Sequence, residues 1–226
     1  MGWANYAWFG GEFVQHAWVP MMYDYAKSFD FYLCPSATRK WREVDDMMSH
    51  ITAWDFQFLE EEFATSVWWP YYRVGTDTNP IYAYGSYGKN EFVTYTTEDA
   101  VGDWTSDFYL NIRVKNVAKI PLLGDCDFAG GFPHVEDVPA ETRYHGAPVD
   151  DDETNRWNLD RHRLSVNLVF LDWSVRKVGL RQLWSFKWSK QKDEAGLDAW
   201  RIPNIPDWND PMQWPEWMRK SKNYDL

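Results

Sequence analysis

Imidazole and carboxylate groups in the second half of the chain are the side chains whose spacing could support chemistry. His162 and Asp172 have nine residues between them. Asp125 and Asp127 lie earlier, on either side of Cys126. Paired carboxylates can work as acid and base, and His162 with one of these aspartates could hold a metal ion. None of the five histidines has HExxH or HxH spacing, so the pattern favours a structural His162 that bonds to a carbonyl or carboxylate where a strand begins.

The chain lacks the sequence signatures of nucleophilic catalysis and of a zinc framework. The chain contains no GxSxG motif and no CxxC pair, and neither Cys34 nor Cys126 lies in a recognisable catalytic context. We therefore expect no enzyme activity, and a carboxylate-based hydrolase is the least favoured alternative. The two cysteines are consistent with two buried thiols or with one disulfide, and a bridge that closed a loop of about 90 residues would contribute roughly 4 to 5 kcal/mol.

A run of four acidic residues is the candidate for a calcium loop. It comprises Asp150, Asp151, Asp152 and Glu153. Calcium takes about six to eight oxygen ligands, so these carboxylates would bind it only if backbone and other oxygen atoms converged on them. EF-hand spacing and its central glycine are both absent. A solvated acidic loop is the favoured interpretation, calcium is the weaker alternative, and no other cofactor is indicated.

The charge balance excludes one class of partner. The chain has 34 acidic and 23 basic residues and a formal net charge of −11. Nucleic acid needs a basic footprint, so we expect no nucleic-acid partner, and an anionic membrane surface is disfavoured. No stretch approaches the roughly 18 apolar residues of a membrane span. The first residues also lack the basic start and apolar run of a secretory signal, so we expect the chain as given to be soluble.

Aromatic residues are unusually abundant. The chain contains 16 Trp, 13 Tyr and 13 Phe. Rings supply much of the burial in protein cores, so a core built of rings is the favoured interpretation. Exposed Trp and Tyr platforms that stack on sugar rings are the alternative, which makes a carbohydrate-binding module with a polysaccharide ligand the second functional hypothesis.

Hydrophobic alternation predicts a β-hairpin in the last third of the chain. The residues that share one face are Leu164, Val166, Leu168 and Phe170. A two-residue turn at Asp172 and Trp173 returns the chain. Phe170 would then face Val175, and Gly179 ends the second strand. Asp172 suits the first position of a tight turn, where its side chain bonds to N–H groups ahead of it.

Two further segments follow the hairpin. Apolar residues at i, i+3, i+4 and i+8 predict a short amphipathic helix, and they are Leu180, Leu183, Trp184 and Trp188. The next segment holds four prolines before Trp217. It is therefore predicted to be an irregular tail held down by Trp208, Trp214 and Trp217.

Earlier segments give weaker signals. Residues 51–63 could form a strand or a helix; their alternation favours a strand at first, and three Glu residues then blur the pattern. The short apolar run 120–123 is typical of a buried strand. Residues 82–93 are rich in Gly and Tyr and place Asn90 beside a predicted strand start. A short helix is expected after Pro20.

Four blocks of the sequence carry a family resemblance. They are YLCPSAT at 32–38, YGSYGKNEFV at 84–93, IPLLGDCD at 120–127, and Arg161-His162 followed by Asn167, Phe170 and Asp172. In this order they resemble the pilin-like proteins of planctomycetes and related bacteria, which are labelled type II secretion or prepilin-type proteins. The C-terminal motif of that family is a histidine, nine residues and Asp-Gly, and the resemblance spans most of the chain.

The resemblance implies an α+β fold, in which an antiparallel sheet carries short helices and long irregular loops. It implies one head domain over residues 1–226, with His162, Asn167, Asp172 and Trp173 as structural motif positions. Asn167 is expected to bond to a neighbouring loop. The family also implies a non-enzymatic structural role in the cell envelope, on its periplasmic or extracellular side. Other pilin-like subunits or secretion components would be the partners, reached through an N-terminal helix.

Two features depart from the family pattern. Family members begin with a basic leader, a processing site and a long apolar helix, none of which is found in this chain. Trp173 stands where the motif has Gly. A non-glycine residue at positive φ costs about 1 to 2 kcal/mol, so we expect a turn that is longer, shifted or of another type, with the Trp173 ring packed down.

Overall fold

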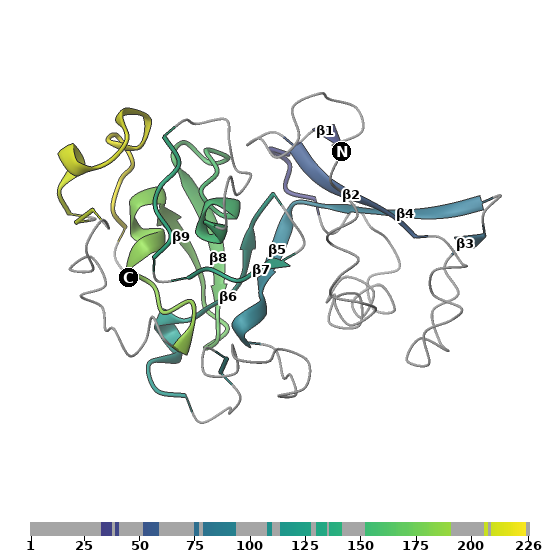
Figure 1. Ribbon diagram of the computed structural model, residues 1–226, viewed down its shortest axis with the longest axis horizontal. Helices are drawn as coiled ribbons and strands as arrows, with labels where there is room; N and C mark the ends of the chain where they lie inside the picture. Colours follow the sequence, from purple (N-terminus) through teal and green to yellow (C-terminus); the bar gives the residue numbers. More distant parts are fainter. Residues whose placement is uncertain are drawn as a thin grey trace.

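The computed structural model describes the strands and the C-terminal third of the chain most fully (Figure 1). The described residues are 33–37, 39–40, 52–58, 75–76, 79–93, 108–109, 114–127, 130–134, 136–141, 152–190, 206–207 and 209–224. The helix predicted after Pro20 lies outside them. The expected single domain over residues 1–226 extends beyond them and stays a prediction.

A five-stranded mixed sheet forms the body of the described structure. Its spatial order is β7 (Gly130–Gly131), β5 (Tyr87–Asn90), β6 (Pro121–Asp125), β8 (Ser165–Phe170) and β9 (Val175–Gly179). The β5–β7 pair is parallel, and the β5–β6, β6–β8 and β8–β9 pairs are antiparallel. The strand predicted at 120–123 is therefore confirmed for residues 121–123 as part of β6, although Leu122 and Leu123 are half-buried. A sheet with few helices agrees with an α+β or mostly-β fold.

β8 and β9 form the predicted hairpin, but their register differs from the prediction by one residue. Val169, rather than Phe170, pairs with Val175. The Phe170 N–H donates to the Ser174 carbonyl at 2.9 Å, and the Trp173 N–H donates to the Phe170 carbonyl at 2.8 Å. Three residues therefore lie between the hydrogen-bonded residues Phe170 and Ser174, and the expected two-residue turn was wrong. The expectation of a longer turn is confirmed.

The buried face of β8 carries the main core, as the alternation predicts. Val166, Leu168 and Phe170 are fully buried. Aromatic rings from the following segments pack in the same cluster, where the Phe170 and Phe186 ring centroids lie 5.1 Å apart. The larger set in this core comprises Cys126, Trp157, Leu159, Val178, Leu180, Leu183, Trp184, Trp188, Trp214 and Met218.

The helical elements that lie wholly within the described residues are 3-10 helices. These helices are η4 (Glu91–Val93), η6 (Val117–Lys119), η7 (Glu153–Arg156), η8 (Leu180–Ser185), η10 (Pro211–Gln213) and η11 (Glu216–Met218). The predicted helix is present as the 3-10 helix η8, and Trp184 and Trp188 lie in the core as expected. Its amphipathic character was wrong, because all six residues of η8 are buried. None of the helical elements in the described ranges is long and apolar enough to cross a membrane.

The C-terminal tail is an irregular strap, as predicted. It covers the polar side of η8, where Arg181 Nη2 donates to the Ser221 carbonyl at 2.7 Å and Gln182 Nε2 to the Tyr224 carbonyl at 2.8 Å. Trp214 is buried, and Trp217 is partly buried against the core cluster. Because the tail supplies these acceptors, η8 has no solvent-exposed face. Trp208 lies outside the described residues.

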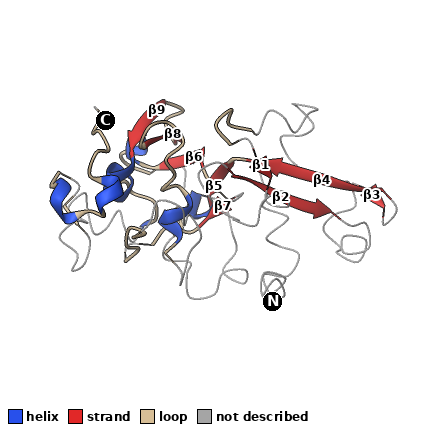
Figure 2. Cartoon of the chain, turned by 90° about the horizontal axis from the view of Figure 1, so that it is seen from above, coloured by secondary structure: helices blue, strands red, loops and turns tan. Residues whose placement is uncertain are grey.

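A second sheet extends from the first. Its order is β1 (Arg39–Lys40), β2 (Thr52–Phe58), β4 (Asn79–Gly85) and β3 (Gly75–Thr76). The strand predicted within 51–63 is confirmed as β2. Only Ser86 separates β4 from β5, so one extended segment runs from the smaller sheet into the larger one. Figure 2 shows the helical turns gathered beside the larger sheet, while the β2–β4 ribbon extends away from it.

Candidate functional site

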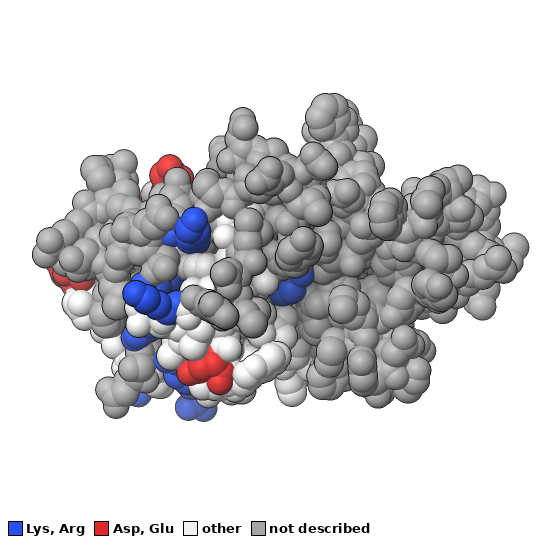
Figure 3. All heavy atoms as spheres, turned by 90° about the horizontal axis from the view of Figure 1, so that it is seen from below, with Lys and Arg blue, Asp and Glu red and all other residues white. Residues whose placement is uncertain are grey.

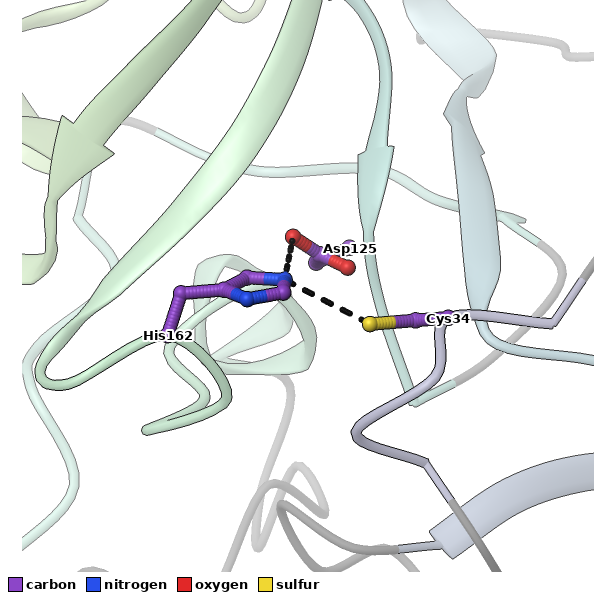
Figure 4. Close-up of side chains that lie close together, drawn as sticks. All are labelled: Cys34, Asp125 and His162. Atoms are coloured by element: carbon purple, nitrogen blue, oxygen red, sulfur yellow. Dashed lines mark hydrogen bonds and ion pairs between the residues drawn. The ribbon is translucent and has the colours of Figure 1, made fainter.

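Cys34, Asp125 and His162 meet at one point, although they are far apart in the chain (Figure 4). His162 Nε2 lies 3.1 Å from Asp125 Oδ2 and 3.4 Å from Cys34 Sγ. One ligand-type atom from each residue lies within 4.8 Å of the other two. Cys34 and Asp125 are buried, while the His162 side chain is 24% exposed. The cluster therefore meets solvent on the imidazole side.

Strand ends and one tight turn position these side chains. Asp125 is the last residue of β6, and His162 lies in the bend that leads into β8. Cys34 begins a turn in which the Ala37 N–H donates to the Cys34 carbonyl at 2.8 Å. Pro35 follows Cys34, and its fixed φ suits the second position of such a turn.

Arg161 holds the main chain around the cluster. Its Nη1 donates to the Ser86 carbonyl at 2.5 Å and to the Cys126 carbonyl at 2.9 Å. The Ser86 hydroxyl in turn accepts the Cys34 N–H at 2.5 Å. The buried guanidinium thus fixes the junction of β4 and β5 against the end of β6. That junction is where Cys34 is held.

The two carboxylate oxygens of Asp125 have different surroundings. Oδ2 accepts the main-chain N–H of Asn167 at 2.7 Å and also faces His162. Oδ1 is buried and has no hydrogen-bond partner. Leaving a buried acceptor unpaired costs about 1 to 3 kcal/mol, so this oxygen requires an explanation.

Burial and the charge of Asp125 act on two neighbouring acids. Burial first, and Asp125 second, raise the pKa of the Cys34 thiol above its usual value. The same two causes, in the same order, raise the pKa of Tyr87 to about 12. Reactive cysteines have lowered pKa values and partial exposure. Cys34 has neither property.

Asp127 lies close to this cluster but belongs to a different environment. It is fully buried, and neither of its carboxylate oxygens has a hydrogen-bond partner. Burial raises the pKa of Asp127 well above its usual value, and the charges of Arg156 and Arg161 oppose that effect. Asp127 therefore does not join His162, and Asp125 alone among the predicted aspartates does.

Asn90, like Arg161, joins separate segments of the five-stranded sheet by hydrogen bonds. Its Nδ2 donates to the Pro121 carbonyl at 3.0 Å and to the Trp188 carbonyl at 2.8 Å. Its Oδ1 accepts the Phe92 N–H at 3.1 Å. One amide therefore joins β5, the start of β6 and the segment after η8.

The acidic run does not converge on a single point in its described part. Asp152 Oδ1 accepts the Val138 N–H at 3.1 Å. Glu153 Oε1 bonds to Arg156 Nη2 at 3.0 Å, and its Oε2 accepts the Phe132 N–H. These carboxylates are used by protein donors on different segments. The other two candidates for a calcium loop, Asp150 and Asp151, lie outside the described residues.

Asp172 and Trp173 lie at the opposite end of β8 from His162. Asp172 Oδ1 accepts the Ser174 N–H at 3.0 Å and the Ser174 hydroxyl at 2.6 Å, which confirms its predicted turn role. Trp173 has a φ of 65° and is 76% exposed. The expected packing of its ring was therefore wrong, because the three-residue loop projects it outward. Asp172 has no part in the cluster around His162.

The two cysteines are free thiols in the structure. Cys34 faces His162, whereas Cys126 packs in the main core cluster. The disulfide that the sequence left open is therefore not formed here. Cys34 is the member of the cluster that sequence reasoning missed, because no spacing relates it to a histidine 128 positions away.

Comparisons with models of protein families, with curated proteins and with solved structures found no match for this chain.

Proposed function

We propose that this chain is the non-enzymatic head of a pilin-like cell-envelope protein, with a structural or interaction role. The observation that carries the proposal is the meeting of the four sequence blocks that resemble the pilin-like family. Cys34, Ser86 and Asp125 come from the first three blocks, and Arg161 and His162 come from the fourth. Hydrogen bonds and close contacts connect these residues directly. Chance matches scattered along a chain have no reason to bond to one another.

The bonds made by these blocks support a structural role. Arg161 and Asn90 each satisfy two main-chain carbonyls on separate segments. Buried carbonyls without a donor cost free energy, so side chains that supply donors fix how the segments pack. The raised pKa of the buried Cys34 thiol also argues against a nucleophilic cysteine.

The carbohydrate-binding alternative requires two or three exposed rings in one plane. Of the six tryptophans whose burial the structure describes, only Trp173 is exposed. Trp217 is partly buried, and its indole N–H donates to the Ala140 carbonyl at 3.0 Å. The described tryptophans therefore support burial over a sugar platform.

Charge supports a protein partner over nucleic acid. The net charge is −11. On the face drawn in Figure 3, lysine and arginine side chains of described residues lie in several separate places, and acidic side chains are present on the same face. Nucleic acid binding favours a continuous basic stripe. We propose other pilin-like subunits or secretion components as partners and the periplasmic or extracellular side of the envelope as the location.

The proposal is tested in the native host. The protein, tagged at its C-terminus, is followed by cell fractionation, and intact cells are treated with a crosslinker before mass spectrometry of the captured complexes. We expect the protein in the envelope fraction, crosslinked to other prepilin-type subunits. Recovery from the cytoplasm without such crosslinks would contradict the proposal.

Two arginine variants provide a matched pair for this experiment. Arg161→Met removes the donors for the Ser86 and Cys126 carbonyls, whereas Arg163 is exposed. Arg161→Met should lose roughly 2 to 4 kcal/mol of stability, and its crosslinked complexes should decrease. Arg163→Met should retain both. Equal complexes from the two variants would show that the bonds of Arg161 do not matter for assembly.

A further inference from the structure

We propose that Cys34, Asp125 and His162 form a binding site for one zinc-like divalent cation. The ligand atoms are Cys34 Sγ, a carboxylate oxygen of Asp125 and His162 Nε2. A fourth position remains for water or an outside donor on the exposed side of the imidazole. This site goes beyond the proposed structural role and does not depend on it.

The two distances from His162 Nε2 are close to those between ligands of a tetrahedral ion, and the Cys34 and Asp125 ligand atoms lie within 4.8 Å of each other. Bonds of about 2.3 Å to sulfur and about 2.0 Å to nitrogen and oxygen place the ligand atoms roughly 3.3 to 3.6 Å apart. The observed separations are 3.4 Å between Cys34 Sγ and His162 Nε2, and 3.1 Å between His162 Nε2 and Asp125 Oδ2. Small shifts of side chains would complete the geometry.

All three side chains can offer an electron pair to the same point. His162 Nε2 carries either one hydrogen or one lone pair. When it carries the lone pair, that lone pair faces both the Cys34 sulfur and the Asp125 carboxylate. A cation between the three atoms would be bound by the imidazole nitrogen, the thiolate sulfur and a carboxylate oxygen together.

The second carboxylate oxygen provides an independent observation. Asp125 is fully buried, yet its Oδ1 has no hydrogen-bond partner. Oδ2 is already used by the Asn167 N–H at 2.7 Å, which orients the carboxylate toward the cluster. A bound cation would give the Asp125 carboxylate a partner in addition to the Asn167 N–H. A metal-ligating carboxylate held by an outer hydrogen bond is a common arrangement.

The donor set selects the class of ion. One sulfur, one imidazole nitrogen and one carboxylate oxygen suit zinc and similar borderline ions, whereas calcium and magnesium prefer oxygen alone. Binding requires the thiolate, so Cys34 releases its proton to solvent as the cation–sulfur bond forms. The cation would then tie the turn at Cys34 to the end of β6 and to the bend before β8.

The test uses the full chain after chelator treatment under reducing conditions, titrated with Co²⁺ and then with Zn²⁺. We expect one Co²⁺ per chain, with the near-ultraviolet absorption of a cobalt–thiolate bond and displacement by Zn²⁺. Cys126→Ser is the matched control, because Cys126 is also a buried free thiol. It should bind as the parent does. Cys34→Ser should lose the thiolate absorption and weaken Zn²⁺ binding by at least about 100-fold.

A measurement on the unmodified chain keeps the test valid if Cys34→Ser does not fold. X-ray absorption of the Zn²⁺ complex should show one sulfur ligand at about 2.3 Å, with the remaining ligands nitrogen or oxygen. The same spectrum is expected from Cys126→Ser. No binding to the parent chain, a zinc environment without sulfur, or thiolate absorption that survives in a folded Cys34→Ser would overturn the proposal.

Discussion

Asp127 is a buried acid whose surroundings favour the protonated form. It is fully buried, and neither carboxylate oxygen accepts a hydrogen bond. Burial is the largest influence on its pKa and raises it well above 3.8, while Arg156 and Arg161 lower it less. The folded chain therefore keeps this proton over a pH range in which the unfolded chain has lost it. By linkage, its contribution to stability is fully present at low pH and is lost as pH rises through the folded-state pKa.

Asp127→Asn tests this sign. Asparagine imitates the protonated carboxyl and cannot ionise, so the variant should gain roughly 1 to 3 kcal/mol over the parent at pH 7. Urea unfolding of both proteins should show the difference shrinking to near zero as pH falls toward about 4. Asp172→Asn is the control of opposite sign, because hydrogen bonds from Ser174 lower the pKa of Asp172. A difference for Asp127→Asn that grows at low pH would contradict the argument.

The residues of the site could be predicted only in part. His162 and Asp125 were identifiable as candidate ligands by their types, and Asp172 by its place in a turn. Which aspartate meets His162 depends on the pairing of β6 with β8, and this pairing leaves Asp127 beyond the end of β6. Cys34 was not identifiable, because its partner lies 128 positions away and the contact depends on tertiary packing.

The hairpin loop between β8 and β9 places Trp173 in a strained conformation. The φ of Trp173 is 65°, a region that favours glycine. The hydrogen bond from the Trp173 N–H to the Phe170 carbonyl closes the turn, and the next residue resumes pairing. A turn followed by one left-handed residue is typical of three-residue hairpin loops. Because the ring is 76% exposed, little packing offsets the strain.

Trp173→Gly should therefore stabilise the protein. Replacing a non-glycine residue at positive φ by glycine raises the free energy of unfolding by about 1 to 2 kcal/mol. The greater conformational freedom of glycine in the unfolded chain offsets part of that gain. We expect a net gain of about 1 kcal/mol in urea unfolding. Trp173→Ala removes the same ring but retains a Cβ, so it should gain little. Equal gains from both variants would assign the effect to the ring and not to the backbone.

The elements themselves were predictable where the pattern was strictly periodic. Alternation from Val166 to Phe170 identified β8 and its buried face. The predicted pairing of β8 with β9 was wrong by one residue. An Asp-Trp pair does not indicate whether the residue with positive φ belongs to a two-residue or a three-residue loop. The spacing of Leu180, Leu183 and Trp184 indicated a helix but neither its 3-10 type nor the tail that covers its polar side.

The tail and the hairpin depend on one another across the whole molecule. The Ser221 hydroxyl accepts the Leu180 N–H at 2.8 Å and donates to the Leu164 carbonyl at 2.9 Å. The Lys222 main chain lies directly over Gly179, where an added Cβ would be 1.8 Å from the Lys222 carbonyl oxygen. The sequence indicated a tail held down by tryptophans. It did not indicate that glycine at position 179 is required for the tail to approach.

Gly179→Ala should displace the tail. Its φ of −71° is accessible to alanine, so the cost is steric and not conformational. Overpacking of this kind costs roughly 1 to 3 kcal/mol. Loss of the Ser221 bonds should also expose the tail to trypsin at Lys220 and Lys222. Urea unfolding and limited proteolysis measure the two effects.

A truncation provides the control for this steric argument. A chain that ends at Ser221 lacks the Lys222 carbonyl, so Gly179→Ala should cost much less in the truncated chain than in the full one. The four proteins form a double-mutant cycle, whose interaction energy measures the contact between position 179 and the tail. An equal penalty in both backgrounds would show that alanine at this position disturbs the hairpin or η8 and leaves the tail in place.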